Sequence, residues 1–391
     1  MMDKGRQASW WPLLIRQIIC NYRSIKFPAL ADPNIYYWEV VMEKAVRLIE
    51  IQKMRSQFLS EFNRDWDVFL LACEPNLSGA QQLHIGNHIR PQLACWGFMI
   101  NKNLAEYSDY SKISHLAVSV EAVHKASVII DDIIDGDTKR RGQDCMHREF
   151  GEYPTVFFAV CMLAKGISQL GDLFSGEPRW TYTRMVNTLC DTIHAMCKGA
   201  IAEISATAQQ QTDLSFVQTI INCETAQLIQ NSLYMGFLLA DEPNEALGDM
   251  LCEIGTKCGY LFQVMNDMEP FCNPDYIAEY KGSVNADFIR ARKSIVLPRL
   301  YEMCSKRERS ILMDAIQNQD GFDEVRILFE RYMVREKVAG EIEEIYRSIQ
   351  NILCRIGQSG RAEWAECFST FAEELQNRYR TILYPGHGRG N

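Results

Sequence analysis

Three aspartates lie close together at the end of a strongly apolar segment. The run Val128-Ile129-Ile130 is followed directly by Asp131 and Asp132, and Asp135 comes four residues after Asp131. On a helix, residues four apart share a face, and Asp132 would flank that face. Carboxylates this close repel one another unless a cation lies between them, and magnesium prefers such hard oxygen ligands. The motif therefore predicts a magnesium site with Asp131, Asp132 and Asp135 as metal ligands.

Positive charge follows these aspartates after one short loop, as Lys139, Arg140 and Arg141. Guanidinium groups bind phosphate oxygens in a fixed, often bidentate geometry. Acids for a metal beside arginines for an anion predict a diphosphate site. The alternative is an exposed charged turn between two helices, which is the usual role of charge runs. The uninterrupted apolar residues before the acids indicate a buried helix and favour the diphosphate site.

Helices must position these groups, because apolar residues recur at three- and four-residue spacing through most of the chain. Strand-like alternation is almost absent. Breakers such as Gly136 and Asn273-Pro274 separate the periodic segments. We predict an all-α fold, a bundle of roughly ten or more helices. The predicted helical segments are 38–58, 113–135, 155–170, 183–208, 214–240, 247–270 and 326–355.

The length and composition of the chain favour one large helical domain. With 391 residues and 47% apolar composition, the chain can bury a large core. No linker-like stretch divides it. We predict a single domain over residues 35–382, preceded by an N-terminal arm or helix (1–34) and followed by a glycine-rich disordered tail (383–391).

Charge and cysteine usage exclude several classes of protein. The net charge of −9 argues against a broad surface for nucleic acid. The 14 cysteines form no CxxC pair and no zinc-ligand cluster, so we expect reduced thiols in the core. We see neither a secretory leader nor an uncharged apolar stretch of roughly 18 residues, the length of a membrane span. We therefore expect a cytoplasmic protein without a transmembrane segment.

Residues 121–135, together with Arg140-Arg141-Gly142, resemble the first aspartate-rich motif of the trans-isoprenyl diphosphate synthases, the polyprenyl synthetase family. The likeness is strongest to the geranylgeranyl diphosphate synthase type, and its order and spacing cover most of residues 80–300. The resemblance implies an isoprenoid-synthase-type bundle around a central cavity, a homodimer, and a cluster of three magnesium ions held by acids on two facing helices.

The resemblance also implies a role for each matching residue. Asp131 and Asp135 would ligate magnesium, and Arg140 would hold the allylic diphosphate whose ionisation the metals drive. The resulting allylic cation would alkylate isopentenyl diphosphate, the acceptor. The diphosphate of the acceptor would be held by Arg90, His124 and Arg141, although a lone histidine on an apolar helix is often a satisfied core residue. By this resemblance the catalytic residues are Asp131, Asp132, Asp135 and Arg140.

The second metal motif departs from the family pattern of Phe-Gln, two residues, then Asp-Asp-x-x-Asp. Here Asn266 replaces the first acid, Asp267 remains, and Pro270 stands in place of the last acid. An asparagine carbonyl still ligates magnesium, so we predict Asn266 and Asp267 as ligands. Glu269, three residues after Asn266, could supply the missing charge from the same face.

The acceptor site departs as well. The family's Gly-Lys-x-x-Arg-Pro is Gly86-Asn87-x-x-Arg90-Pro91 here, so one positive charge is missing. The family's Lys-Thr dipeptide is Glu224-Thr225, which reverses a charge, and its Gly-Gln-x-x-Asp ends here in Glu203. The full predicted substrate-binding set is Asn87, Arg90, His124, Ser127, Arg140, Arg141, Glu224, Gln263, Lys281 and Lys293.

These departures lie in the acceptor contacts and the second half, whereas the first aspartate motif is intact. We therefore predict a magnesium-dependent prenyltransferase that ionises an allylic isoprenoid diphosphate. The acceptor would be isopentenyl diphosphate or a non-standard nucleophile oriented by Glu224 or Glu203. The predicted donor has about ten to twenty carbons. By the resemblance, the small Ala126 and Ser127, one turn before Asp131, would permit a donor or product of about fifteen to twenty carbons. The alternatives are a terpene cyclase on the same scaffold and a non-catalytic regulatory subunit of a prenyl diphosphate synthase.

Overall fold

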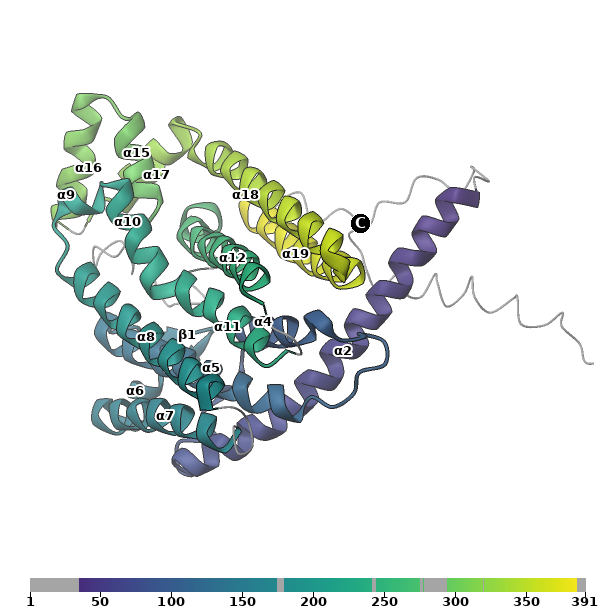
Figure 1. Cartoon of the computed structure of the whole chain (residues 1–391). Coiled ribbons are helices and arrows are strands. Elements are labelled where there is room, and N and C mark those ends of the chain that lie inside the picture. The colour runs from purple at the N-terminus through teal and green to yellow at the C-terminus, as the bar shows by residue number, and fades with distance from the viewer. Residues whose placement is uncertain are drawn as a thin grey trace, which may run out of the picture.

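The structure is a computed structural model and describes residues 35–173, 179–240, 244–274, 277, 294–318 and 320–384. Nearly all of these residues are helical (Figure 1). The first half contains α2 (Ile35–Cys73), α3 (Gln81–His84), α4 (Ile89–Phe98), η1 (Met99–Asn101), α5 (Ser111–Asp135), α6 (Met146–Phe150), α7 (Glu152–Leu173) and α8 (Arg179–Ile204). The second half contains α9 (Ala208–Gln211), α10 (Leu214–Ile221), η2 (Asn222–Ala226), α11 (Gln227–Leu238), α12 (Glu245–Cys272), α15 (Val296–Met303), α16 (Lys306–Asn318), α17 (Phe322–Arg331), α18 (Val334–Ile356), η3 (Gly357–Arg361) and α19 (Ala362–Leu383).

The all-α prediction is confirmed. Within the described ranges, the only strands are β1 (Lys139–Arg140) and β2 (Gln143–Asp144), which pair as a short antiparallel hairpin. Helix α5 ends at the predicted breaker, since Gly136 adopts a left-handed conformation with φ 59°. The predicted segment 326–355 is two helices instead of one, because Met333 is also left-handed, with φ 51°. Helices α3, α4, α6, α15, α16 and α19 lie outside the predicted segments.

Helix α5 lies at the centre of the bundle. Its residues from Ile113 to Ala126 are mostly buried, and it contacts α2, α4 and α7. Helix α11 packs between α4 and α12, and the antiparallel pair α18 and α19 covers α12 (Figure 1). One hydrophobic cluster extends from Ile51 to Leu383. The predicted domain limits stay a prediction, and residues 1–34 and 385–391 lie outside the described ranges.

Two of the described helices, Ser111–Asp135 and Glu152–Gly171, are long and apolar enough to cross a membrane by length and composition alone. The bundle buries 72% of the most apolar window of the first and 33% of that of the second. A core helix of a folded bundle meets the same criterion, so these helices are weak evidence for membrane insertion. The expected absence of a transmembrane segment stays a prediction.

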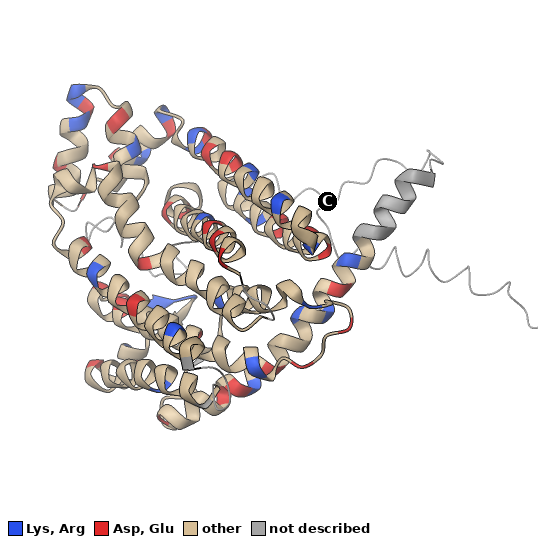
Figure 2. Ribbon diagram, in the orientation of Figure 1, with Lys and Arg blue, Asp and Glu red and all other residues tan. Residues whose placement is uncertain are grey.

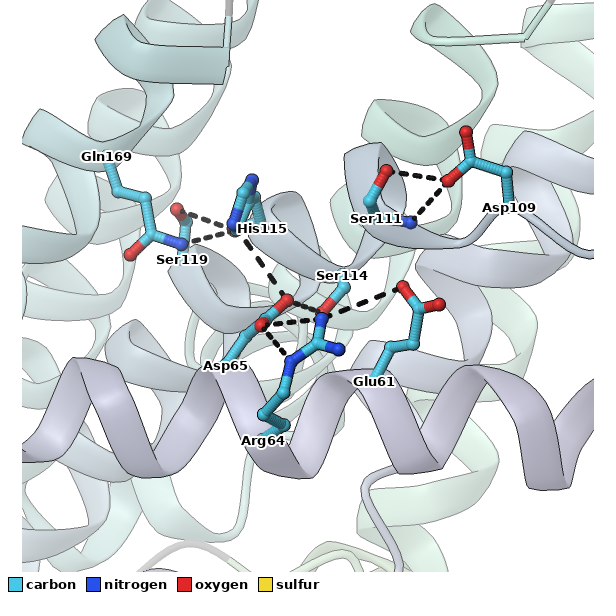
Figure 3. Close-up of polar contacts among 9 residues, drawn as sticks. All are labelled: Glu61, Arg64, Asp65, Asp109, Ser111, Ser114, His115, Ser119 and Gln169. Carbon is cyan, nitrogen blue, oxygen red and sulfur yellow. Dashed lines mark hydrogen bonds and ion pairs between the residues drawn. The ribbon is translucent and has the colours of Figure 1, made fainter.

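Hydrogen bonds between three helices fix the N-terminal half of α5 (Figure 3). The Ser114 hydroxyl donates to Asp65 Oδ2 of α2 at 2.5 Å. The same carboxylate accepts from Arg64 at 3.2 Å and lies 3.9 Å from His115 Nε2. From α7, Gln169 Nε2 donates to the His115 carbonyl at 3.1 Å. These contacts hold α5 against both neighbours, far from the end that carries the aspartates.

Helices α4 and α11 cross at two glycines. A Cβ atom added to Gly97 would lie 2.0 Å from the Leu233 carbonyl oxygen, and one added to Gly236 would lie 1.9 Å from the Ala94 carbonyl oxygen. Both obstacles are backbone atoms, which cannot move aside as a flexible side chain would. The crossing therefore requires glycine on both helices, and it places α4 with Arg90 beside the core.

We expect Gly236→Ala to lower the free energy of unfolding by about 1–3 kcal/mol, because the added methyl group would push α11 away from α4. Gly340→Ala is the matched control, since Gly340 is an exposed helical glycine with no atom within 4 Å of an added Cβ. The control should gain up to about 1 kcal/mol from helix propensity. Urea unfolding followed by circular dichroism measures both, and equal effects of the two substitutions would contradict the close crossing.

Candidate active site

The three aspartates at the end of α5 have different environments. The Asp131 side chain is 53% exposed, whereas Asp132 and Asp135 are buried. Among the described residues, no three Asp, Glu, His or Cys side chains gather closely enough to hold a metal ion. The three aspartates therefore do not converge on one point as predicted. The donors still suit magnesium, because they are carboxylates and the buried Oδ2 of Asp132 has no hydrogen-bond partner.

Arg140 returns to these acids through the β1–β2 hairpin. Its Nε donates to Asp132 Oδ1 at 2.8 Å, and its Nη2 also donates to Asp132. The same guanidinium lies 3.9 Å from Asp131 and 3.5 Å from Asp137. Burial opposes the charge, but Asp132 and its neighbours outweigh burial and raise the pKa of Arg140 above its ordinary value. Arg140, the predicted donor-site arginine, therefore contacts the predicted metal ligands Asp131 and Asp132.

A second group of charges surrounds Arg90, where α4, α5 and α12 meet. The Arg90 side chain is buried, and its Nη1 donates to His124 Nε2 at 3.1 Å. Its guanidinium lies 5.7 Å from the centre of the Phe262 ring, a cation–π arrangement. Burial lowers the pKa of Arg90 to about 10, so the side chain remains cationic at neutral pH. The structure therefore brings the predicted residues Arg90 and His124 into contact.

His124 is neutral in this environment. Burial, followed by the charge of Arg90, lowers the pKa of His124 well below its ordinary value of 6.5. Because Arg90 donates to Nε2, the ring proton lies on Nδ1. His124 therefore orients Arg90 and adds no positive charge to an anion site.

Glu121, one turn before His124, was not among the predicted site residues. It is 2% exposed, and its Oε1 lies 3.4 Å from His88 Nδ1, at the left-handed residue before α4. Burial raises its pKa, but the contact with His88, followed by the charged groups around it, Lys125 among them, brings the pKa of Glu121 down to about 2. The signal in the sequence was its helical spacing, since Glu121, His124 and Lys125 share one face of α5.

Lys125 and Arg141 hold the loop that precedes α4. The Lys125 ammonium donates to the carbonyls of Gln82 at 2.8 Å and Ile85 at 2.9 Å. Arg141 Nη1 donates to the Ile85 carbonyl as well. Ser127 is partly exposed, and its hydroxyl donates to the His124 carbonyl of its own helix at 2.8 Å. The predicted residues Arg90, His124 and Arg141 thus lie around one loop.

Asp267 in the second motif has a packing role. It is buried and accepts hydrogen bonds from Gln263 Nε2 at 2.7 Å and from the Ile295 backbone N–H at 2.8 Å. Gln263 in turn accepts from the Thr225 hydroxyl at 2.8 Å. Asn266 is exposed on the same helix. Of the two predicted ligands, Asn266 is therefore the accessible one. Asp267 joins α12 to the start of α15, and Gln263 joins α12 to η2.

Glu224 lies in η2, a π-helical turn between α10 and α11. It packs on α8, where a Cβ added to Gly199 would lie 2.8 Å from Glu224 Cγ. Glu203, also on α8, is buried. Lys281 and Lys293 lie outside the described residues.

The model of the polyprenyl synthetase family matches residues 78–331, which is more than half of the chain. The short chain isoprenyl diphosphate synthase of Methanocaldococcus jannaschii is 23% identical over 242 residues, 61% of this chain and 69% of that protein. The heptaprenyl diphosphate synthase component 2 of Geobacillus stearothermophilus is 25% identical over 275 residues, 65% of this chain and 80% of that protein.

Solved structures show the same fold. The polyprenyl synthase of Caulobacter crescentus, complexed with calcium and isoprenyl diphosphate, aligns with a TM-score of 0.66 at 18% identity, over 83% of this chain and 95% of that chain. A Trypanosoma brucei farnesyl diphosphate synthase, complexed with bisphosphonate, aligns with a TM-score of 0.69 at 14% identity, over 83% of this chain and 99% of that one.

The lowered pKa of His124 makes folding stability depend on pH. Below pH 6.5 the histidine takes up a proton in the unfolded chain but not in the folded one, so the free energy of unfolding should fall as pH decreases from 6.5. The slope from this one group is at most about 1.4 kcal/mol per pH unit. Chemical unfolding at pH 7.0, 6.0 and 5.0 measures it.

His124→Gln should flatten this pH dependence. His194→Gln on the exposed face of α8 serves as the control for the loss of one histidine. The interpretation fails if the two variants lose the same part of the slope.

Proposed function

Because the chain belongs to the polyprenyl synthetase family of prenyltransferases, we propose that it ionises an allylic isoprenoid diphosphate of about ten to twenty carbons and transfers the prenyl group. The observation that carries this proposal is the charge arrangement at the end of α5. An accessible carboxylate, Asp131, lies beside a buried carboxylate, Asp132, that is paired with the cationic Arg140. Such an arrangement suits a metal-bound diphosphate better than either a metal or an anion alone.

Magnesium fits this arrangement. It commonly binds one or two protein carboxylates and completes its shell with substrate phosphates and water, so a closed protein cage is not needed. Asp131 would be the first ligand, the unpaired oxygen of Asp132 the second, and the exposed Asn266 of α12 would contribute from the other motif. When bound, magnesium supplies Lewis-acid stabilisation of the departing diphosphate.

The protein groups supply orientation and charge around that diphosphate. Arg140 shares its charge among Asp131, Asp132 and Asp137, so diphosphate oxygens would replace part of this ion pairing when the donor binds. The apolar residues that precede the acids on α5 would keep water away from the prenyl cation.

The acceptor would bind near Arg90 and Arg141, the cations around the loop before α4. Isopentenyl diphosphate is the acceptor that this charge favours. A non-standard nucleophile remains the second candidate, because Glu203 and Glu224 are carboxylates at positions where the family has an aspartate and a lysine, and either would orient a basic acceptor.

The proposal is tested by incubating the protein with magnesium and each of dimethylallyl, geranyl, farnesyl and geranylgeranyl diphosphate, with and without isopentenyl diphosphate. We expect diphosphate release and a longer prenyl diphosphate when both substrates are present. Cyclic hydrocarbons without isopentenyl diphosphate would indicate a cyclase. No release from any donor would contradict catalysis and favour a regulatory subunit.

Asp131→Asn should lower the rate of diphosphate release by roughly 100-fold or more, because the accessible metal ligand loses its charge. Asp144→Asn is the matched control, since Asp144 is an exposed carboxylate on the adjacent hairpin. Rates at saturating magnesium measure both variants. Equal rates for the two would remove Asp131 from the metal site.

We also propose a homodimer that forms through α7. Its surface carries an apolar stripe of Tyr153, Val156, Phe157 and Val160, with Tyr153 79% and Phe157 69% exposed. Charged side chains are sparse along this helix (Figure 2). An exposed apolar stripe of this kind on a folded domain is typical of a protein interface, and a twofold axis would pair it with itself.

Phe157→Glu should shift the protein from dimer to monomer, because it would place two charges in the dimer contact. Ile327→Glu is the control, since Ile327 is 58% exposed on α17, which lies at the opposite end of the bundle from α7 (Figure 1). Size-exclusion chromatography coupled to light scattering measures the molar mass of each variant. A wild-type protein that is monomeric at micromolar concentration would refute the dimer.

A further inference from the structure

We infer that Arg378 of α19 binds the diphosphate of the acceptor and supplies the positive charge that Asn87 lacks. This inference rests on the proposed function and names one residue of its acceptor site. Asn87 and Arg378 lie near opposite ends of the described chain, and the fold brings them together. In the amide orientation that satisfies both groups, Asn87 Oδ1 accepts hydrogen bonds from both terminal nitrogens of Arg378, one of them at 2.9 Å.

Asn87 belongs to the loop that the acceptor-site cations hold. The Ile85 carbonyl of this loop accepts from Lys125 and Arg141, and Arg90 follows three residues after Asn87. Arg378 therefore reaches, from the C-terminal helix, the same loop that Arg141 reaches from the β1–β2 hairpin.

The charge of Arg378 is not neutralised by its neighbours. It makes no ion pair with a carboxylate in the part of the chain that the structure describes. The nearby acids are already engaged, since Glu374 pairs with Arg55 at 2.8 Å and Glu343 pairs with Arg380 at 2.8 Å. Both Arg378 and Asn87 are exposed, so a ligand has access to them.

The surrounding site has more positive than negative charge. Arg90, Lys125 and Arg141 lie around the loop, and the buried carboxylate among them is Glu121. Adding Arg378 increases this excess, which a bound dianion would relieve. A guanidinium also binds two phosphate oxygens at once, whereas the neutral amide of Asn87 offers a hydrogen bond without charge. The acceptor class that fits is therefore a diphosphate such as isopentenyl diphosphate.

The test measures binding without turnover. Isothermal titration of isopentenyl diphosphate into the protein, with magnesium and without an allylic donor, gives its dissociation constant. Arg378→Gln retains a side-chain donor for Asn87 but removes the charge, and we expect binding about 10- to 100-fold weaker. Arg378→Lys keeps the charge and should lose less. Arg380→Gln, two residues along the same exposed helix, is the matched control and should bind like the wild type.

A second variant separates ligand binding from a structural role. If Arg378 only ties α19 to the loop, then adding Asn87→Lys to Arg378→Gln cannot restore affinity. If Arg378 supplies the charge, the lysine at position 87 should recover most of the lost affinity, with thermal stability unchanged.

Unchanged affinity in Arg378→Gln, or a double variant as weak as the single one, would overturn the inference. So would a wild-type protein that releases diphosphate from allylic donors but does not bind isopentenyl diphosphate, and that result would leave the prenyltransferase proposal standing. Binding that depends on Arg378 in a protein that ionises no donor would support the inference and refute catalysis.

Discussion

An ionised carboxylate buried in the bundle sets the arrangement of the acceptor side of the site. Glu121 is 2% exposed, and a charge at that depth is stable only with cationic and hydrogen-bonding partners. His88 Nδ1 lies 3.4 Å from this carboxylate, Lys125 adds positive charge beside it, and Lys125 also holds the backbone before α4. That backbone determines where Arg90 enters the core. The geometry of the anion site thus follows from satisfying one negative charge.

The donor side differs, because the protein pairs its carboxylates only in part. Asp132 is paired with Arg140 through one oxygen, its other oxygen has no hydrogen-bond partner, and Asp131 faces solvent. A fully paired cluster would be more stable and less able to accept a metal-bound substrate. The two halves of the site therefore differ in function, one being preformed and the other completed by its ligand.

Local patterns in the sequence predicted the helices and the position of the acids, because helical periodicity and the glycine at 136 act within a few residues. They did not predict the different burial of Asp131 and Asp132, which depends on what packs against each face of α5. They also missed the contact between Asn87 and Arg378, since no local signal links residues so far apart in the chain. The break between α17 and α18 at Met333 was not predicted either, because a left-handed methionine has no sequence signature.

The π-helical turn η2 sets the register between α10 and α11. A π turn holds one residue more than the α-helical turn it replaces, and each residue of an α-helix advances the side chains by about 100°. Shortening η2 by one residue would therefore rotate all of α11 about its axis relative to α10. Gly236 would leave its crossing with α4, and a side chain with a Cβ would arrive there. A deletion or insertion in η2 would therefore be tolerated in evolution only if the residues of α11 that face α4 changed with it.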